Sequence, residues 1–219
     1  MFEKYCCENV TLYNGGIIGY ASLSELIKMV RDILYLKPDV IVVFDGYNDI
    51  QAGVSNFEFQ DIYSIMEYAK EAMPNMVLHS KMDKNIFRGT GPDDIIGKWL
   101  TNIESMYAIA CMQNIKFYSF IQPMVMTQKI HTKHGLSIQK MSHVIFKPKI
   151  VENMKLFREN GKNIEKGHPY IHDLSHIFDE KDVYMDHCHV WERGNEIIAD
   201  SIWEVIEPGV KEIMEMKAK

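Results

Sequence analysis

The sequence predicts an α/β fold, an open and mostly parallel sheet with helices on both faces, in a single domain spanning residues 1–219. Segments with strand-like and helix-like patterns alternate along the chain, as a parallel sheet requires. Val40–Phe44 is continuously apolar, which is typical of a strand that is covered on both faces. No linker rich in proline, glycine or serine divides the 219 residues, so we expect one hydrophobic core.

The first part of the chain predicts a strand, a helix and a second strand. Val10–Tyr13 forms a short strand that ends at a glycine-rich turn. Ser22 and Glu25 have the spacing of a capping box, and apolar residues then recur at helical spacing as far as Leu34. The Val40–Phe44 strand follows and is the central element of this sequence.

The rest of the chain continues this alternation. Helices are predicted at residues 61–73, 95–112 and 148–160 and around Ile198, and strands at residues 117–121 and 183–185. Residues 171–178 have only a weak pattern. Residues 74–94 and 124–147 have no clean period and are predicted to be loops, the second of them a long excursion over the surface of the kind that often carries function.

Composition and charge exclude several classes of protein. The net charge of −6, from 24 basic and 30 acidic residues, disfavours nucleic acid as a partner. No apolar run approaches the roughly 18 residues needed to span a bilayer, and the N-terminus lacks the basic and apolar regions of a signal peptide. The cysteines have no metal-type spacing, so we expect thiols in a reducing compartment, a cytoplasmic protein and no membrane partner. They are Cys6, Cys7, Cys111 and Cys188.

Basic residues are concentrated in one stretch, because residues 105–151 contain six lysines and no acidic residue. One interpretation is a solvated basic loop and helix edge. The other is a basic wall that faces an anionic substrate, in which Lys129 and Lys133 would lie close to the substrate, together with Gln122 at the end of the preceding strand.

Four residues closely follow predicted strand ends, where open α/β sheets place their sites: Gly19, Asn48, Gln122 and His189. Asp186 lies three residues before His189, and a carboxylate in that position can fix the tautomer of an imidazole that acts as a general base. The alternative is that Asp186 only satisfies backbone N–H groups at a helix N-terminus.

Asn48 and Gly19 have a chemical interpretation and a structural one. The Asn48 amide and a backbone N–H at Gly19 are suitable donors to an oxyanion. Glycine and asparagine also favour turns for backbone reasons alone. Residues 172–189 contain several potential metal ligands, but their spacing matches no zinc template, so no metal site is predicted.

Taken together, these motifs resemble the SGNH (GDSL-type) serine hydrolases. That family has a glycine after its second strand, Gly-x-Asn-Asp after its third and Asp-x-x-His before its last helix. Gly19, Gly46-Tyr47-Asn48-Asp49 and Asp186-His187-Cys188-His189 are similar to these blocks and occur in the same order. The resemblance implies that Gly19 and Asn48 are oxyanion donors, His189 is the base and Asp186 orients it.

The chain departs from this family at its first block, a Gly-x-Ser at the end of the first strand that supplies the nucleophile. No such motif precedes Asn9, and Ser22, Ser24, Ser55 and Ser137 are not adequate substitutes, Ser22 and Ser24 because they are better explained as helix capping. The resemblance therefore implies a flavodoxin-like sheet of order 2-1-3-4-5 that is truncated at the N-terminus and lacks its first, central strand. We expect Val10–Tyr13 to be displaced into the gap or loosely attached.

The expected function is hydrolysis of an ester, such as an O-acyl group on a carbohydrate, without a cofactor. Because no nucleophile is identified, the chain is expected to be inactive alone. Two alternatives remain open: a non-catalytic remnant, and a flavodoxin-like module that binds an anionic ligand at the strand ends.

Overall fold

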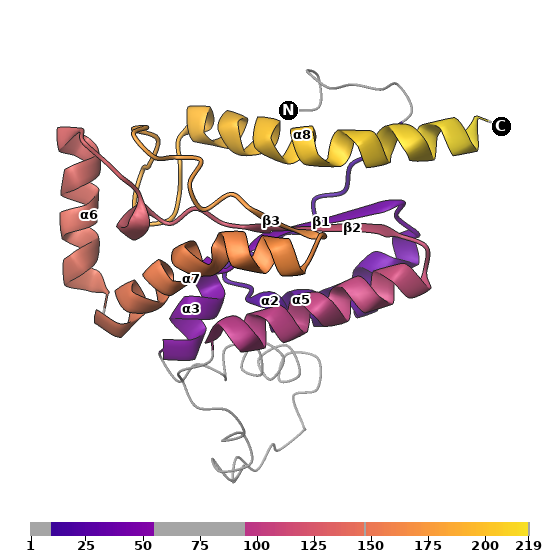
Figure 1. Cartoon of the computed structure of the whole chain (residues 1–219), viewed down its shortest axis with the longest axis horizontal. Helices are drawn as coiled ribbons and strands as arrows, with labels where there is room; N and C mark the ends of the chain where they lie inside the picture. Colours follow the sequence, from indigo (N-terminus) through magenta and orange to yellow (C-terminus); the bar gives the residue numbers. More distant parts are fainter. Residues whose placement is uncertain (1–9, 55–94, 147, 219) are drawn as a thin grey trace, which may run out of the picture.

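The computed structural model describes residues 10–54, 95–146 and 148–218, and it has an α/β architecture built on a parallel sheet (Figure 1). Helix α8 covers one face of the sheet, and helices α2, α3, α5 and α7 lie on the opposite face. The predicted α/β class and parallel sheet are confirmed for these residues.

The sheet of the described residues has three parallel strands in the order β1-β2-β3. Strand β1 (Val40–Asp45) pairs with β2 (Lys116–Ile121) along its whole length, and β2 pairs with β3 (Ile171–Asp173) over three residues. The apolar strand β1 therefore lies at an edge of this sheet. Burial alternates along β1, with Ile41 and Val43 buried and Val42 40% exposed on the other face, although the sequence pattern is that of a strand covered on both faces.

The helices lie mostly where apolar spacing predicts them. They are α2 (Ser22–Lys28), continued by the single turns η1 (Met29–Ile33) and η2 (Leu34–Leu36), then α3 (Tyr47–Val54), α5 (Ile95–Met112), η3 (Val125–Thr127), α6 (Lys133–Ile145), α7 (Pro148–Gly167) and α8 (Glu192–Lys217). Lys37 follows η2 and ends this helical segment in the left-handed conformation, with φ of 48°. Pro148 begins α7 at the position where its missing N–H costs no helical hydrogen bond.

Two expectations for the N-terminal part are wrong. Ala21 is the N-cap of α2, and Ser22 does not cap the helix, because its hydroxyl is bonded to Asp49. The Asp49 carboxylate also accepts the Ser22 N–H, so the cap comes from a residue 27 positions away. Val10–Tyr13 is not a strand but an exposed segment.

The second half of the chain differs from the sequence prediction in three places. The strand lies at Ile171–Asp173, and Val183–Met185 contributes only an isolated bridge between Tyr184 and Val190. Residues 133–145 form α6, capped by Thr132, where a loop was predicted.

The predicted helix at 61–73 and loop at 74–94 lie outside the described residues.

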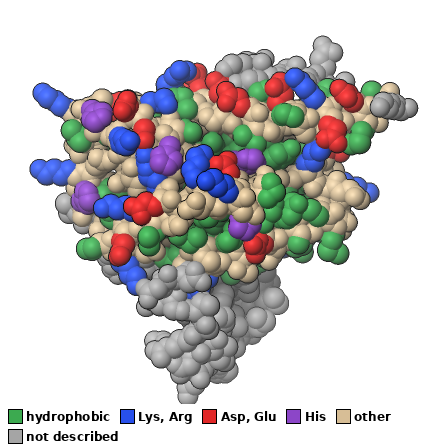
Figure 2. Space-filling view, viewed as in Figure 1, with side chains coloured by type: hydrophobic (Ala, Val, Ile, Leu, Met, Phe, Trp, Pro, Cys, Tyr) green, Lys and Arg blue, Asp and Glu red, His purple; other side chains and the backbone are tan. Residues whose placement is uncertain are grey.

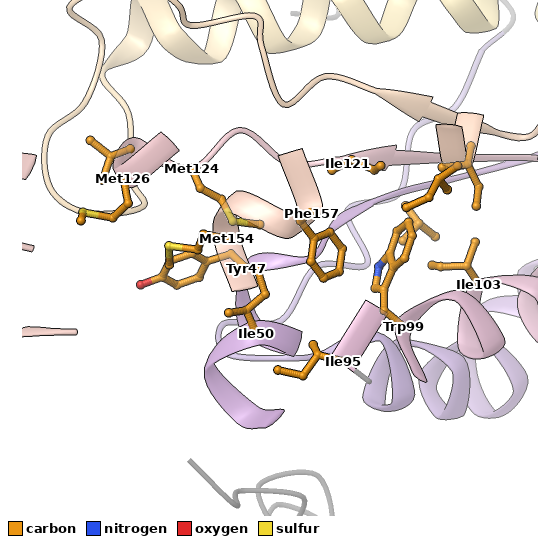
Figure 3. Close-up of a cluster of buried hydrophobic side chains, with 14 of the residues drawn as sticks. Tyr47, Ile50, Ile95, Trp99, Ile103, Ile121, Met124, Met126, Met154 and Phe157 are labelled. Atoms are coloured by element: carbon orange, nitrogen blue, oxygen red, sulfur yellow. The ribbon is translucent and has the colours of Figure 1, made fainter. Parts of the chain in front are cut away.

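The main core lies between the sheet and helices α5 and α7. Trp99 on α5 and Phe157 on α7 meet edge to face, with ring centroids 5.3 Å apart (Figure 3). Trp99 also donates its ring N–H to the buried Asp45 carboxylate, 2.7 Å away. The core therefore fixes the carboxyl end of β1, from which the candidate site begins. None of the described helices has the length and apolar character that crossing a membrane requires.

Candidate functional site

The Asp186–His189 segment is a tight turn between the bridged residues Tyr184 and Val190. Asp186 Oδ1 accepts the backbone N–H groups of Cys188 (2.9 Å) and His189 (2.8 Å). Its second oxygen, Oδ2, lies 2.7 Å from Nδ1 of His189. The Asp186 carboxylate therefore has both of the roles that the sequence left as alternatives: it accepts backbone N–H groups, and it orients the imidazole.

The electrostatics of this turn favour an ionised Asp186. Partial burial by itself would raise the pKa of its carboxyl, but hydrogen bonds from the Cys188 and His189 backbone and from the His189 ring outweigh it and hold the pKa well below its usual range. An ionised carboxylate at Nδ1 favours the neutral His189 tautomer with its proton on that nitrogen. The Nε2 lone pair is then free to accept a proton, and the ring is 70% exposed.

A cavity of about 200 Å³ adjoins His189 at the carboxyl ends of β1 and β2. Its polar lining comes from Gln122, Cys188, His189 and Asn195, and its apolar lining from Phe44, Pro123, Phe178, Val190 and Ile198. Gln122 and His189, both proposed from the sequence, therefore border the same space. Its volume lies below the roughly 300–1,000 Å³ that is usual for small-molecule sites, so it has room only for a small group.

Asn48 and Gly19 lie together in a neighbouring part of the fold. The Asn48 amide donates to the Tyr20 carbonyl oxygen at 2.9 Å, which holds the 19–20 segment against the start of α3. Gly19 is exposed, has φ of 81° and would have open space around an added Cβ. Neither residue lines the 200 Å³ cavity.

Tyr47 connects the two groups of residues. Its ring lies 6.0 Å from that of His187, centroid to centroid, and burial, followed by the nearby Cys188 thiol, raises the pKa of its hydroxyl. Tyr47 immediately precedes Asn48, so the Asn48 segment and the Asp186–His189 turn are in contact through this side chain. This role of Tyr47 is not predictable from the sequence, because a contact across 140 residues leaves no local signal.

Cys188, expected from the sequence to be a free thiol without a metal-type spacing, lies at the same turn. Its Sγ lies 3.5 Å from His189 Nδ1. Burial, followed by the negative charge of Asp186, raises the thiol pKa to about 11, so Cys188 is not an activated nucleophile. Asp186, Cys188 and His189 each offer a ligand atom within 4.8 Å of the others, which makes this turn a set of residues able to hold a metal ion.

The described serines do not supply a nucleophile to His189. No hydroxyl of the described residues hydrogen-bonds its ring. Ser22 is fully buried and is bonded to Asp49 and Asn102, which explains why its hydroxyl is not available. Ser137 is on α6, and Ser55 lies outside the described residues.

Lys129 and Lys133 do not line the cavity. Both side chains are exposed, and the Lys129 backbone bonds to the acidic loop after β3 through Asp179 Oδ1 (3.0 Å) and the Glu180 N–H (2.7 Å). On the α6 side of the molecule basic and acidic side chains are interspersed (Figure 2). The basic stretch of the sequence is therefore not a single-sign wall in this view.

A group of acidic side chains lies close to the Asn48 segment. Burial raises the pKa of Asp45 well above its usual range, and the nearby Glu25 and Asp49 carboxylates raise it further. Burial also raises the Asp49 pKa to about 6, against hydrogen bonds from Ser22 that lower it. These groups belong to α2, α3 and β1; Asp45 is buried, and Glu25 and Asp49 are partly buried.

No protein family matches the chain, and no similar curated protein or solved structure was found.

Proposed function

We propose that this chain provides the base and the oxyanion donors of an SGNH-type serine hydrolase that cleaves an ester, with the nucleophilic serine coming from residues outside this sequence. The observation that supports this most directly is the Asp186–His189 hydrogen bond of 2.7 Å beside a cavity at the carboxyl end of the sheet. Carboxylate, imidazole and cavity occur together where an open α/β sheet places its ligand.

His189 is the general base in this proposal. Its Nδ1–H is engaged by Asp186 Oδ2, so Nε2 takes the proton of a serine hydroxyl as that oxygen attacks the acyl carbon. Asp186 then stabilises the imidazolium that forms. The proton passes from His189 to the departing alcohol, and water repeats the sequence to release the acid.

Asn48 and Gly19 are the proposed oxyanion donors. One N–H of the Asn48 amide is bonded to the Tyr20 carbonyl oxygen, which fixes the side chain and leaves the second N–H for an oxyanion. The Gly19 N–H donates to no other residue among those the structure describes. Tyr47, through its contact with His187, holds this segment beside the Asp186–His189 turn.

The cavity favours a small acyl group, because about 200 Å³ of mostly apolar space borders His189. An O-acyl group on a carbohydrate is the substrate class we propose, by resemblance to the family. None of the steps requires a cofactor. An anionic ligand has less support, since Lys129 and Lys133 do not line the cavity.

A non-catalytic remnant is the second candidate, and the lack of a serine hydroxyl on His189 among the described residues favours it. Turnover of 4-nitrophenyl acetate separates the two. The chain should be compared with a form that carries the residues encoded immediately upstream, each with His189→Ala and with His131→Ala as a control at an exposed histidine elsewhere.

The proposal expects turnover by the longer form that His189→Ala abolishes and His131→Ala leaves intact. Turnover that survives His189→Ala would contradict the assigned base. Inactivity of both forms would favour the remnant, and His189-dependent turnover by the short chain would place the nucleophile within this sequence.

A further inference from the structure

The Asp186–His189 turn brings together three side chains of the types that bind transition metals. Asp186, Cys188 and His189 contribute one carboxylate oxygen, one sulfur and one ring nitrogen, and all three atoms lie within 4.8 Å of one another. The turn is held by the Tyr184–Val190 bridge and by the Met185 N–H, which donates to the His189 carbonyl oxygen at 2.9 Å. The backbone therefore presents the three donors without any long-range rearrangement.

The distances suit a cation of the size and softness of Zn²⁺. Zinc binds sulfur at about 2.3 Å and imidazole nitrogen at about 2.0–2.1 Å, so in a tetrahedral site the two ligand atoms are roughly 3.5 Å apart. Cys188 Sγ and His189 Nδ1 are 3.5 Å apart. Asp186 Oδ2 lies 2.7 Å from the same nitrogen, a hydrogen-bond distance that must open by somewhat less than ~1 Å when a metal replaces the shared proton.

The surroundings leave room for the remaining ligand. Cys188 and His189 border the 200 Å³ cavity, which also has Gln122 and Asn195 in its lining. A water molecule or a ligand from solvent can therefore occupy the fourth position, and three protein ligands with one open position is a common arrangement for zinc outside purely structural sites.

We propose that Asp186, Cys188 and His189 form a binding site for a thiophilic divalent cation of the Zn²⁺ class. Coordination uses Asp186 Oδ2, Cys188 Sγ and His189 Nδ1, and the imidazole proton moves to Nε2 while the thiol proton passes to solvent. Hard cations such as Mg²⁺ are excluded by the thiolate and imidazole donors, which match softer metals.

Metal binding and base catalysis exclude each other at this turn. The cation takes the Nδ1 lone pair, breaks the Asp186–His189 hydrogen bond and leaves Nε2 protonated. Reversible inhibition by zinc follows, and this consequence, unlike the binding itself, rests on the proposed function.

The test measures metal binding and needs no enzymatic activity. A reference variant with Cys6, Cys7 and Cys111 changed to serine leaves Cys188 as the only thiol. Equilibrium dialysis against ZnCl₂ is compared for this variant and for its derivatives Cys188→Ser, His189→Ala and His131→Ala. We expect one bound Zn²⁺, affinity at least tenfold weaker for Cys188→Ser and His189→Ala, and no change for His131→Ala.

A second measurement does not depend on any change at the turn. The Co²⁺ complex of the reference variant should show the near-ultraviolet absorption of a thiolate bound to cobalt. Equal zinc affinity with and without Cys188, or a Co²⁺ complex without the thiolate absorption, overturns the site. Zinc binding together with inactivity of every form in the esterase assay would support the metal site and contradict the hydrolase, so the two proposals fail separately.

Discussion

At the scale of single residues, Asp186 determines which ring nitrogen of His189 carries the proton. Three donors converge on its carboxylate, two from the backbone and one from the His189 ring. An asparagine can still accept the two backbone N–H groups through its oxygen, but its amide nitrogen would then face Nδ1. Asp186→Asn should therefore preserve the turn and move the His189 proton from Nδ1 to Nε2.

Nitrogen-15 chemical shifts of the imidazole report this tautomer directly. The native chain should show a protonated Nδ1 in neutral His189, and Asp186→Asn a protonated Nε2. Asp182→Asn, an exposed acid of the same loop, should leave the native tautomer unchanged. The orienting role would be wrong if Nδ1 stayed protonated in Asp186→Asn.

Asp49 gives the fold a pH dependence of unusual sign. Its pKa is about 6 in the folded chain against an ordinary value of 3.8, so between these values the folded state binds more protons than the unfolded state. Its contribution to stability therefore falls as pH rises through this window. From pH 5 to pH 7 the loss amounts to about 1 kcal/mol.

Denaturant unfolding of Asp49→Asn at both pH values tests this effect together with the influence of Asp49 on Asp45, whose pKa the Asp49 carboxylate helps to raise. The variant should lose less stability than the native chain between pH 5 and pH 7. His172 has the opposite influence in the same window, because burial lowers its pKa, but it is common to both proteins and cancels in the difference. Identical pH slopes would show that Asp49 titrates normally.

At the scale of elements, α7 approaches β3 closely enough to require glycine. A Cβ at Gly161 would lie 2.6 Å from Cγ of Asp173. That carboxylate is buried and accepts the Ser175 N–H, so it has little freedom to move. Although alanine favours a helix interior by about 1 kcal/mol, Gly161→Ala should lower the free energy of unfolding by about 1–2 kcal/mol.

Gly167 on the same helix is the matched control. A Cβ there would meet nothing within 4 Å, so Gly167→Ala should change stability by less than about 0.5 kcal/mol. Urea unfolding of the two variants tests the contact. If the Gly161→Ala chain were as stable as the Gly167→Ala chain, α7 and β3 would be able to move apart without lowering the free energy of unfolding.

Elements with a long or uniform pattern were predictable, and those that depend on distant contacts were not. Helix α5 occupies the predicted 95–112 range, since eighteen residues give several repeats of the helical period. Strand β3 was missed because three residues are too few to show a period. Likewise, the Asp186–His189 pair is visible within four residues of sequence, whereas the contact of Tyr47 with this turn depends on the folded chain.

At the scale of the whole molecule, exposed hydrophobic side chains are concentrated on the N-terminal elements of the chain and on the edge strand β1. Of the seventeen large hydrophobic residues exposed in the described part of the chain, ten lie between residues 10 and 42. They belong to the N-terminal segment, to α2 with its continuation and to β1, the edge strand. In Figure 1 the N-terminal segment, in indigo, passes from the α8 side of the sheet to α2. We expect an exposed apolar surface of this kind to bind apolar solutes.

The dye ANS, which fluoresces on exposed apolar surface, provides the measurement for this region. Leu12 and Tyr13 are 63% and 62% exposed, so Leu12→Ser with Tyr13→Ser should lower ANS fluorescence at pH 7 without lowering the midpoint of thermal unfolding. Met112→Ser with Leu136→Ser removes two exposed hydrophobic residues from α5 and α6 and is the matched control. The control should change the signal far less, because its residues are isolated on otherwise polar helix faces. Equal losses in both double variants would show that the N-terminal segment and the β1 edge do not form a distinct apolar surface.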